Sequence, residues 1–266
     1  MVKEFFMPRT IVVTSGKGGV GKTTITANIG LALANLGESV VMIDLDVGLN
    51  NLDIALGIES SVVFDLSDCL SGKCRLGQAL TAYPRCDNLY VLACNNTETK
   101  IILENNMQRV ISKLKEHFDW ILIDSPAGID SGFLCATAFA DEALVVVTPH
   151  VSSVRDSDKV LNILHNKKMN KIGLVINRIR GDLVASNLMI GAKQIASSLR
   201  EKVVGIVPDS DILCTKGIFS GNDLTEKLAF AMLAQNLRDD KFAEFDYMSK
   251  YKGFFGSVRR ALRRKI

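Results

Sequence analysis

Ten residues near the amino terminus, Ser15–Thr24, have the types and spacing that bind nucleotide phosphates. Gly16, Gly21, Lys22 and Thr23 fill the pattern G-x-x-x-x-G-K-[ST], in which the backbone N–H groups of a glycine-rich loop turn toward phosphate oxygens. We expect Lys22 to reach the β- and γ-phosphates of ATP and Thr23 to give its hydroxyl to Mg²⁺. The predicted phosphate contacts are Gly16, Lys17, Gly18, Gly19, Val20, Gly21, Lys22, Thr23 and Thr24. The alternative is a glycine-rich turn without a ligand.

Three aspartates end apolar, β-branched runs that are typical of buried parallel strands. Asp44 and Asp46 close the run from Glu38, and Asp124 closes the run from Phe118. The carboxyl ends of parallel strands face the ligand in doubly wound sheets, so these carboxylates should point at the phosphates. Hydrolysis needs an oriented water and a neutralised phosphate, and carboxylates near a metal supply both. For Asp44 and Asp46 the alternative is that they cap a loop.

The surrounding pattern predicts an α/β fold with a doubly wound, mainly parallel sheet of the P-loop NTPase type and helices on both faces. Further strands are expected at 9–14, 88–92, 141–148, 170–178 and 203–209, and helices at 23–36, 62–70, 76–80 and 103–118. The apolar and charged shares, 47% and 23%, fit a soluble protein with a sizeable core.

The composition also limits the compartment. No apolar run approaches the length of about 20 residues that spans a bilayer, and the first eight residues do not resemble a secretory signal. Six cysteines are scattered without a C-x-x-C pair, so neither a zinc site nor a disulfide framework is indicated, and reducing cytoplasm is expected.

The carboxyl terminus has an amphipathic pattern. Seven basic residues and no acidic one lie between Lys250 and Ile266, although the rest of the chain is net acidic. On a helix, Phe254, Phe255, Val258, Leu262 and Ile266 share one side, and Arg259, Arg260, Arg263 and Arg264 share the other. We expect an ATPase domain over 1–250 and a tail over 251–266 that binds anionic membrane lipids. Docking onto a protein surface and nucleic-acid binding are the alternatives, and no nucleic-acid partner is expected.

Lys17, a second lysine inside the loop, makes the chain similar to the deviant Walker A ATPases, the MinD/ParA family. The resemblance implies an ATP-dependent homodimer in which Lys17 crosses to the partner's nucleotide. It also implies a catalytic role for Lys22, a water-positioning role for Asp46 and a role for Asp44 in the Mg²⁺ shell. By the same resemblance, Asp124 holds Mg²⁺ and the N–H of Gly128 senses the γ-phosphate.

The nucleoside contacts rest on the same resemblance. It implies that Asn177, in the Asn177–Arg178 pair, reads the adenine edge and that Pro208 and Asp209 bound the base pocket. The sequence departs from the MinD pattern at His150, where a ribose-contacting glutamate is usual, and over 212–222. Adenine selectivity is therefore less firmly predicted than phosphate binding.

The partner face is expected at the start of the helix after Pro149. Here Ser152, Arg155, Asp156 and Asp158 resemble the surface on which MinD-type proteins receive the MinC inhibitor and the MinE activator. The implied function is a peripheral ATPase on the cytoplasmic face of the cell membrane that places the division septum and is reset by hydrolysis.

Four other hypotheses for the function of the protein stay open. They are a flagellar-number regulator of the same family, a ParA-like DNA-partitioning ATPase, a scaffold that binds ATP without turnover, and a dimer bridged by an iron–sulfur cluster through Cys94 and Cys135.

Overall fold

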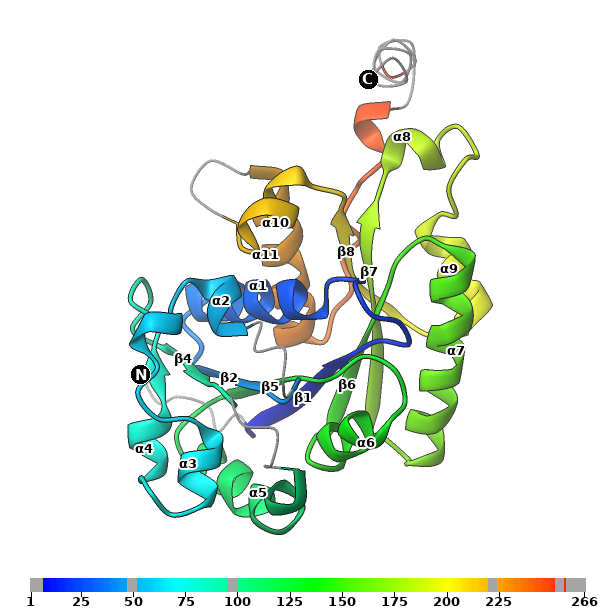
Figure 1. The fold of residues 1–266 in the computed structure, drawn as a ribbon. Helices are drawn as coiled ribbons and strands as arrows, with labels where there is room; N and C mark the ends of the chain where they lie inside the picture. Colours follow the sequence, from blue (N-terminus) through cyan, green and yellow to red (C-terminus); the bar gives the residue numbers. More distant parts are fainter. Residues whose placement is uncertain (1–6, 47–51, 95–99, 220–223, 252–255, 257–266) are drawn as a thin grey trace.

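The computed structural model describes residues 7–46, 52–94, 100–219, 224–251 and Gly256, and of residues 100–105 it describes the backbone only (Figure 1). Within these residues, eight strands form one sheet in the order β3-β4-β2-β5-β1-β6-β7-β8. They are β1 (Arg9–Thr14), β2 (Val40–Asp44), β3 (Thr81–Ala82), β4 (Leu89–Leu92), β5 (Trp120–Asp124), β6 (Glu142–Val147), β7 (Lys171–Ile179) and β8 (Val203–Pro208). The neighbours pair in parallel except β3, which runs antiparallel to β4.

The strands form where apolar, β-branched residues run without interruption, because both faces of the sheet are covered. On β1, Val12 packs into one core layer, whereas Ile11 and Val13 pack into the other. Because parallel strands end at one edge, β1, β2 and β5 deliver the phosphate loop and the aspartates Asp44 and Asp124 to the same place. The doubly wound fold predicted from the sequence is confirmed.

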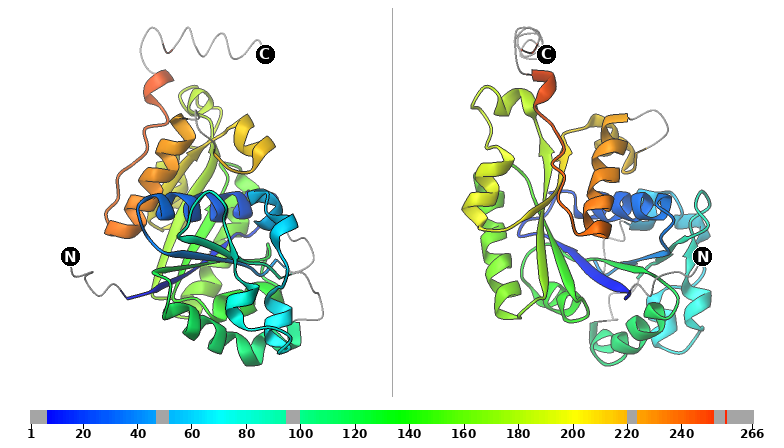
Figure 2. Two further views of the ribbon diagram at one scale, coloured as in Figure 1. Left: turned by 90° about the vertical axis from the view of Figure 1, so that its left-hand side faces the viewer. Right: turned by 180° about the vertical axis from the view of Figure 1, so that it is seen from behind.

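Helices cover both faces of the sheet (Figures 1 and 2). One layer holds α1 (Lys22–Asn35), α2 (Leu52–Leu56), α10 (Asp211–Lys216) and α11 (Leu224–Asp239). The other holds α3 (Leu66–Leu70), α4 (Leu76–Ala79), α5 (Lys100–Lys115), α6 (Ser131–Ala138), α7 (Val151–Asn166) and α9 (Ala192–Leu199). Short turns of helix complete the chain at η1 (Glu59–Ser61), α8 (Gly181–Val184) and η3 (Ser249–Tyr251).

One expected helix begins later than predicted. The run from Val62 becomes helical only at Leu66, because Asp65 caps the helix and its side chain accepts from the backbone of Asp68. The chain before Asp65 lies outside that helix. The two-residue strand β3 has no counterpart in the sequence prediction.

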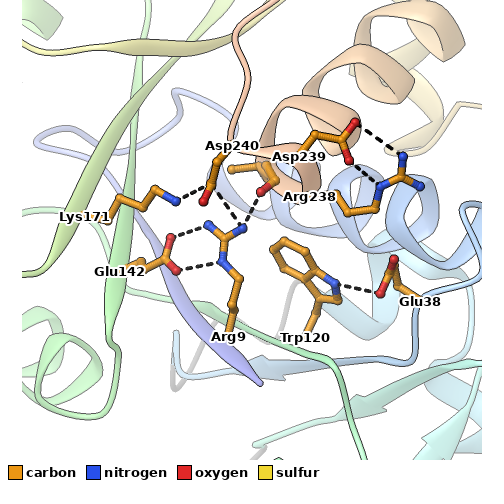
Figure 3. Close-up of polar contacts among 9 residues, drawn as sticks. Arg9, Glu38, Trp120, Glu142, Lys171, Arg238, Asp239 and Asp240 are labelled. Atoms are coloured by element: carbon orange, nitrogen blue, oxygen red, sulfur yellow. Dashed lines mark hydrogen bonds and ion pairs between the residues drawn. The ribbon is translucent and has the colours of Figure 1, made fainter. Parts of the chain in front are cut away.

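A network of charges closes the end of the sheet opposite the phosphate loop (Figure 3). Arg9 donates to the Glu142 carboxylate through Nε and Nη2, with Nε 2.7 Å from Oε1, and its Nη1 donates to the carbonyl of Leu237. Its guanidinium lies 4.6 Å from the ring centroid of Trp120. Arg9 therefore joins β1 to β6 and to the end of α11.

After α11 the chain returns along β8 and β7 to η3 beside α8 (Figure 2). The amide of Asn236 holds this return segment by bonding both the N–H and the carbonyl of Ala243. Further along, the hydroxyl of Tyr247 accepts from the backbone N–H of Ala192 on α9. The return segment thus brings Tyr251 back toward the carboxyl ends of β7 and β8.

Candidate functional site

The glycine-rich loop between β1 and α1 has a backbone that side chains would not permit. Gly19 and Gly21 have φ angles of 76° and 94°, in the left-handed region that favours glycine. A Cβ at Gly21 would also lie 2.6 Å from the side-chain nitrogen of Asn177. Lys22 begins α1 and is 7% exposed, so its charge lies beside the loop rather than in open solvent. This loop at a helix amino terminus suits an anion such as a phosphate.

The same loop packs against α7. A Cβ at Gly16 would lie 2.3 Å from both the backbone carbon and the oxygen of Asp156. No side chain fits between the two backbones, so the glycine is required for the packing itself. The phosphate loop is therefore in direct contact with the second turn of α7.

Two buried aspartates lie side by side at the ends of β2 and β5, where Asp44 and Asp124 are register partners. Asp124 accepts from the hydroxyls of Thr23 at 2.6 Å and Thr26 at 3.1 Å. Burial raises the pKa of Asp124 to about 7, and the charge of Asp44 adds to the rise. Burial likewise raises the pKa of Asp44 to about 6, although the N–H groups of Asp46 and Leu52 donate to it and oppose the rise.

These oxygens fit the group that phosphate chemistry requires. Magnesium prefers hard oxygen ligands, and two buried carboxylates beside the Thr23 hydroxyl form a compact set of such oxygens. Burial, with a smaller contribution from nearby carboxylates, raises the two pKa values, and a divalent cation bound here would favour the charged carboxylates. The chemistry of the donor set therefore agrees with Mg²⁺.

Asp46 is half-buried and lines the open cleft in front of the loop. Burial raises the pKa of its carboxyl, and the charge of Lys22 lowers it. An acid that faces the cleft, close to a buried lysine, can accept a hydrogen bond from water and orient it.

The cleft has a volume of about 670 Å³, within the range of small-ligand sites. It brings together many of the predicted residues, namely Gly18, Gly19, Gly21, Lys22, Thr23, Thr24, Asp46 and Arg178. Its other walls are Ile54, Ala55, Pro126, Ala127, Thr215, Lys216 and Gly217. No sequence motif predicted a place in the cleft for Thr215, Lys216 and Gly217. These residues lie within 212–222, where the sequence departs from the MinD pattern.

Gly128 and Asn177, which the sequence predicts to contact nucleotide, make hydrogen bonds to other residues of the chain. The N–H of Gly128, with φ of 89°, donates to the carbonyl of Ser15 at 3.0 Å. The amide of Asn177 donates to the carbonyl of Val20 at 2.8 Å and accepts from the N–H of Arg178. Contacts of Gly128 with the γ-phosphate and of Asn177 with adenine stay predictions.

Pro208 and Asp209 lie elsewhere. They line a separate cavity of about 180 Å³ together with Arg180, Tyr247 and Tyr251. In this structure they are neighbours of the return segment rather than of the main cleft, and their role beside the base stays a prediction.

The predicted partner face lies on the first turns of α7. Ser152, Arg155 and Asp158 are exposed there, whereas Asp156 is half-buried and pairs with Lys159 at 3.1 Å. The tail residues that carry the membrane prediction, Phe254, Phe255 and 258–266, lie outside the described residues, so that prediction is not tested. His150, predicted as a departure from the ribose contact, is exposed and precedes α7.

Sequence reasoning missed Thr26 and Asn28 on α1. Both are fully buried polar side chains in an otherwise apolar helix, and that contrast is the signal that could have marked them. The cluster alternative gains no support, because Cys94 is 1% exposed and cannot present its sulfur to a second subunit. No group of three or more His, Cys, Asp or Glu side chains that could hold a metal ion occurs among the described residues.

Comparisons with known proteins agree with this geometry. Residues 11–219 match the model of the CobQ/CobB/MinD/ParA nucleotide binding domain. The septum site-determining protein MinD of Synechocystis is 42% identical over 96% of this chain and 99% of its own.

Two solved structures agree as well. A chain of the MinC:MinD cell division protein complex of Aquifex aeolicus superposes with a TM-score of 0.80 at 37% identity, over 88% of this chain and 98% of its own length. MinD of Pyrococcus horikoshii, solved with Mg-ADP, superposes with a TM-score of 0.77 at 30% identity, over 87% of this chain and 96% of its own length. With its phosphate loop, paired aspartates and nearly full-length similarity, the chain belongs to the MinD septum site-determining ATPases of the CobQ/CobB/MinD/ParA nucleotide-binding family.

Proposed function

We propose that this ATPase is a nucleotide-controlled membrane switch that places the division septum. ATP and Mg²⁺ would assemble a homodimer, the dimer would bind anionic membrane on the cytoplasmic face and a MinC-type inhibitor, and hydrolysis would release it. The observation that carries the proposal is the direct packing of Gly16, in the phosphate loop, on Asp156 in the predicted partner face. It gives nucleotide and partner a shared structural element.

The cleft supports hydrolysis through its own side chains. The loop N–H groups and Lys22 would hold the phosphates, and Thr23, Asp44 and Asp124 would hold Mg²⁺, which neutralises charge on the phosphates. Asp46, at the open side of the cleft, would orient the attacking water.

Dimerisation is supported by the position of Lys17. Its side chain is exposed on the loop, next to the cleft-lining Gly18 and Gly19. A lysine in that place can reach an anionic ligand held by a second copy of the chain.

The partner proposal rests on the exposed charges of α7 and on the relative from Aquifex aeolicus, whose structure is a MinC:MinD complex. We place a MinC-type inhibitor and a MinE-type activator on Ser152, Arg155, Asp156 and Asp158. Asp156 packs directly on Gly16, so a change in the phosphate loop would alter the surface that both partners contact.

Membrane association is proposed for the amphipathic sequence 251–266. No helix in the described ranges has the length and apolar character needed to cross a bilayer. A peripheral anchor of this kind binds weakly alone, and two copies in a dimer bind more tightly through their raised effective concentration.

Co-sedimentation with anionic vesicles tests the proposal, using the full chain and a variant that ends before Gly253. ATP alone, compared with ADP and no nucleotide, should drive the full chain onto vesicles, and truncation should abolish this. Binding that ignores nucleotide, or survives truncation, would contradict the switch. Binding to duplex DNA in place of vesicles would favour a partition role.

A further inference from the structure

A buried asparagine on α1 holds one wall of the nucleotide cleft in place. Asn28 is 0% exposed and lies one turn after Thr24. Its amide nitrogen donates to the carbonyls of Thr24 at 2.6 Å and Gly217 at 2.9 Å. Its amide oxygen accepts from the N–H of Phe219 at 2.8 Å. Both amide hydrogens and the oxygen are thus bonded.

The segment that Asn28 holds is a part of the cleft. Thr215, Lys216 and Gly217 line it opposite the loop residues. Gly217 has a left-handed φ of 73°, and a Cβ there would lie 3.2 Å from the carbonyl oxygen of Ala55. Phe219 stacks on Phe230 of α11, with ring centroids 5.8 Å apart. We name residues 215–219 the cleft wall.

The order of strands indicates which part of a nucleotide meets the cleft wall. Asp44 and Asp124, which suit Mg²⁺, end β2 and β5, and Asp46, which suits water, follows β2; all three lie on one side of β1. Arg178, on β7, lies on the other side of β1, and the cleft wall follows β8 on that side. A triphosphate with its γ end toward the aspartates therefore extends its nucleoside toward Arg178 and the cleft wall.

We propose that Asn28 is a positioning residue for nucleotide binding, which fixes the cleft wall relative to the phosphate loop so that the nucleoside is held. The inference rests on the nucleotide site proposed above. Because α1 begins at Lys22 and carries Asn28 less than two turns later, one rigid helix sets the spacing between the phosphate and nucleoside ends of the cleft. Asn28 acts through Gly217 and Phe219 and touches no reacting group.

A matched control is present elsewhere in the chain. Asn236 on α11 is also buried, and its amide bonds Val204 and both backbone groups of Ala243. It lies by Arg9 at the opposite end of the sheet. Asn28→Ala and Asn236→Ala each remove two hydrogen bonds donated to backbone carbonyls and one accepted from a backbone N–H. Both substitutions should therefore lower the melting temperature by similar amounts.

Calorimetric titration of the full chain with Mg-ADP and with Mg-pyrophosphate separates the roles. We expect Asn28→Ala to lower the affinity for Mg-ADP about tenfold and the affinity for Mg-pyrophosphate less than about twofold. Asn236→Ala should lower neither affinity. Asn28→Ala should raise the KM for ATP and spare kcat, because a nucleoside contact binds ground and transition states alike. Equal weakening of both ligands, or of neither, would overturn the inference. If the unaltered chain binds neither ligand, the nucleotide site itself is wrong.

A second variant keeps the test valid if Asn28→Ala does not fold. Gly217→Ala disturbs the cleft wall directly and should also weaken Mg-ADP while sparing pyrophosphate. When both variants fold, the double variant should lose less affinity than the two single losses combined, because they act through one segment. Full additivity, or a Gly217→Ala protein with unchanged Mg-ADP affinity, would count against the proposal.

Discussion

Gly16 and Asp156 touch through their backbones, and the space between them admits no methyl group, since a Cβ on Gly16 would stand 2.3 Å from the carbonyl oxygen of Asp156. One residue belongs to the phosphate loop and the other to the exposed helix on which we place the partners. A shift of the loop when nucleotide binds must therefore be absorbed by α7 or transmitted along it.

The first prediction concerns this contact. Gly16→Ala should force the two backbones apart, lower the stability by about 1–3 kcal/mol and weaken both Mg-ADP and inhibitor binding. Urea unfolding and titration calorimetry measure these effects. Gly77→Ala is the control, because Gly77 is an exposed residue of α4 with nothing near its Cβ position, and alanine there favours the helix. If Gly16→Ala binds both ligands normally, the coupling through Asp156 is absent.

The second prediction concerns Lys17. Lys17→Ala should abolish ATP-driven dimerisation, measured by light scattering, and leave the melting temperature unchanged because the side chain is exposed. Lys22→Ala serves as the comparison, since it should remove nucleotide binding as well. A dimer that persists in Lys17→Ala would remove this residue from the interface.

The third prediction concerns Asp124. Asp124→Asn should stabilise the metal-free protein, because burial disfavours the charged carboxylate, and should slow ATP hydrolysis at least about a hundredfold. Melting curves in EDTA and phosphate release at saturating Mg-ATP check the two parts. Asp65→Asn alters the buried residue that caps α3 and should leave hydrolysis unchanged. A metal-free Asp124→Asn protein that melts lower than the unaltered chain would contradict the argument.

The fourth prediction concerns α7. Replacing Arg155 and Asp158 by alanine should weaken a MinC-type inhibitor about tenfold or more, because charges at an interface centre contribute strongly. ATP hydrolysis without partner should not change, since both side chains are exposed and away from the cleft. Asn166→Ala, at the far end of the same helix, is the control. Equal inhibitor binding by all three proteins would move the partner face elsewhere.

The fifth prediction concerns the charge network at the opposite end of the sheet. Arg9→Ala should cost about 3–5 kcal/mol, because Glu142 is left nearly buried without its partner. Arg238→Ala breaks a more exposed pair with Asp239 in the same region and should cost no more than about 1 kcal/mol. Chemical unfolding of the two variants measures both losses of stability. Similar losses would show that burial of the ion pair does not determine how much stability it contributes.

Local features of the sequence were enough to predict the centre of the site. The loop before Lys22 and the aspartates at strand ends are specified by neighbouring residues, so their positions follow from the fold class. The start of α3 was predicted too early, because the apolar run from Val62 gives no sign that the side chain of Asp65 caps the helix.

Long-range contacts decide the features that the sequence did not predict. The cleft wall is placed by Asn28, which is 191 residues from Phe219. The amide of Asn177 faces Val20, 157 residues away, and no local pattern predicts that orientation. Strand β3 is two residues long and exists through its pairing with β4.

The strand order has a consequence for how this protein is made. The first of the described strands, β1, lies in the middle of the sheet, and its partners are β5 and β6, with Arg9 bonded to Glu142 across 133 residues of chain. A ribosome that adds about 5–20 residues per second leaves this apolar strand without neighbours for several seconds. Until β5 and β6 have been made, β1 has neither of its two neighbouring strands, so the emerging chain exposes an apolar strand with unpaired edges, which favours aggregation.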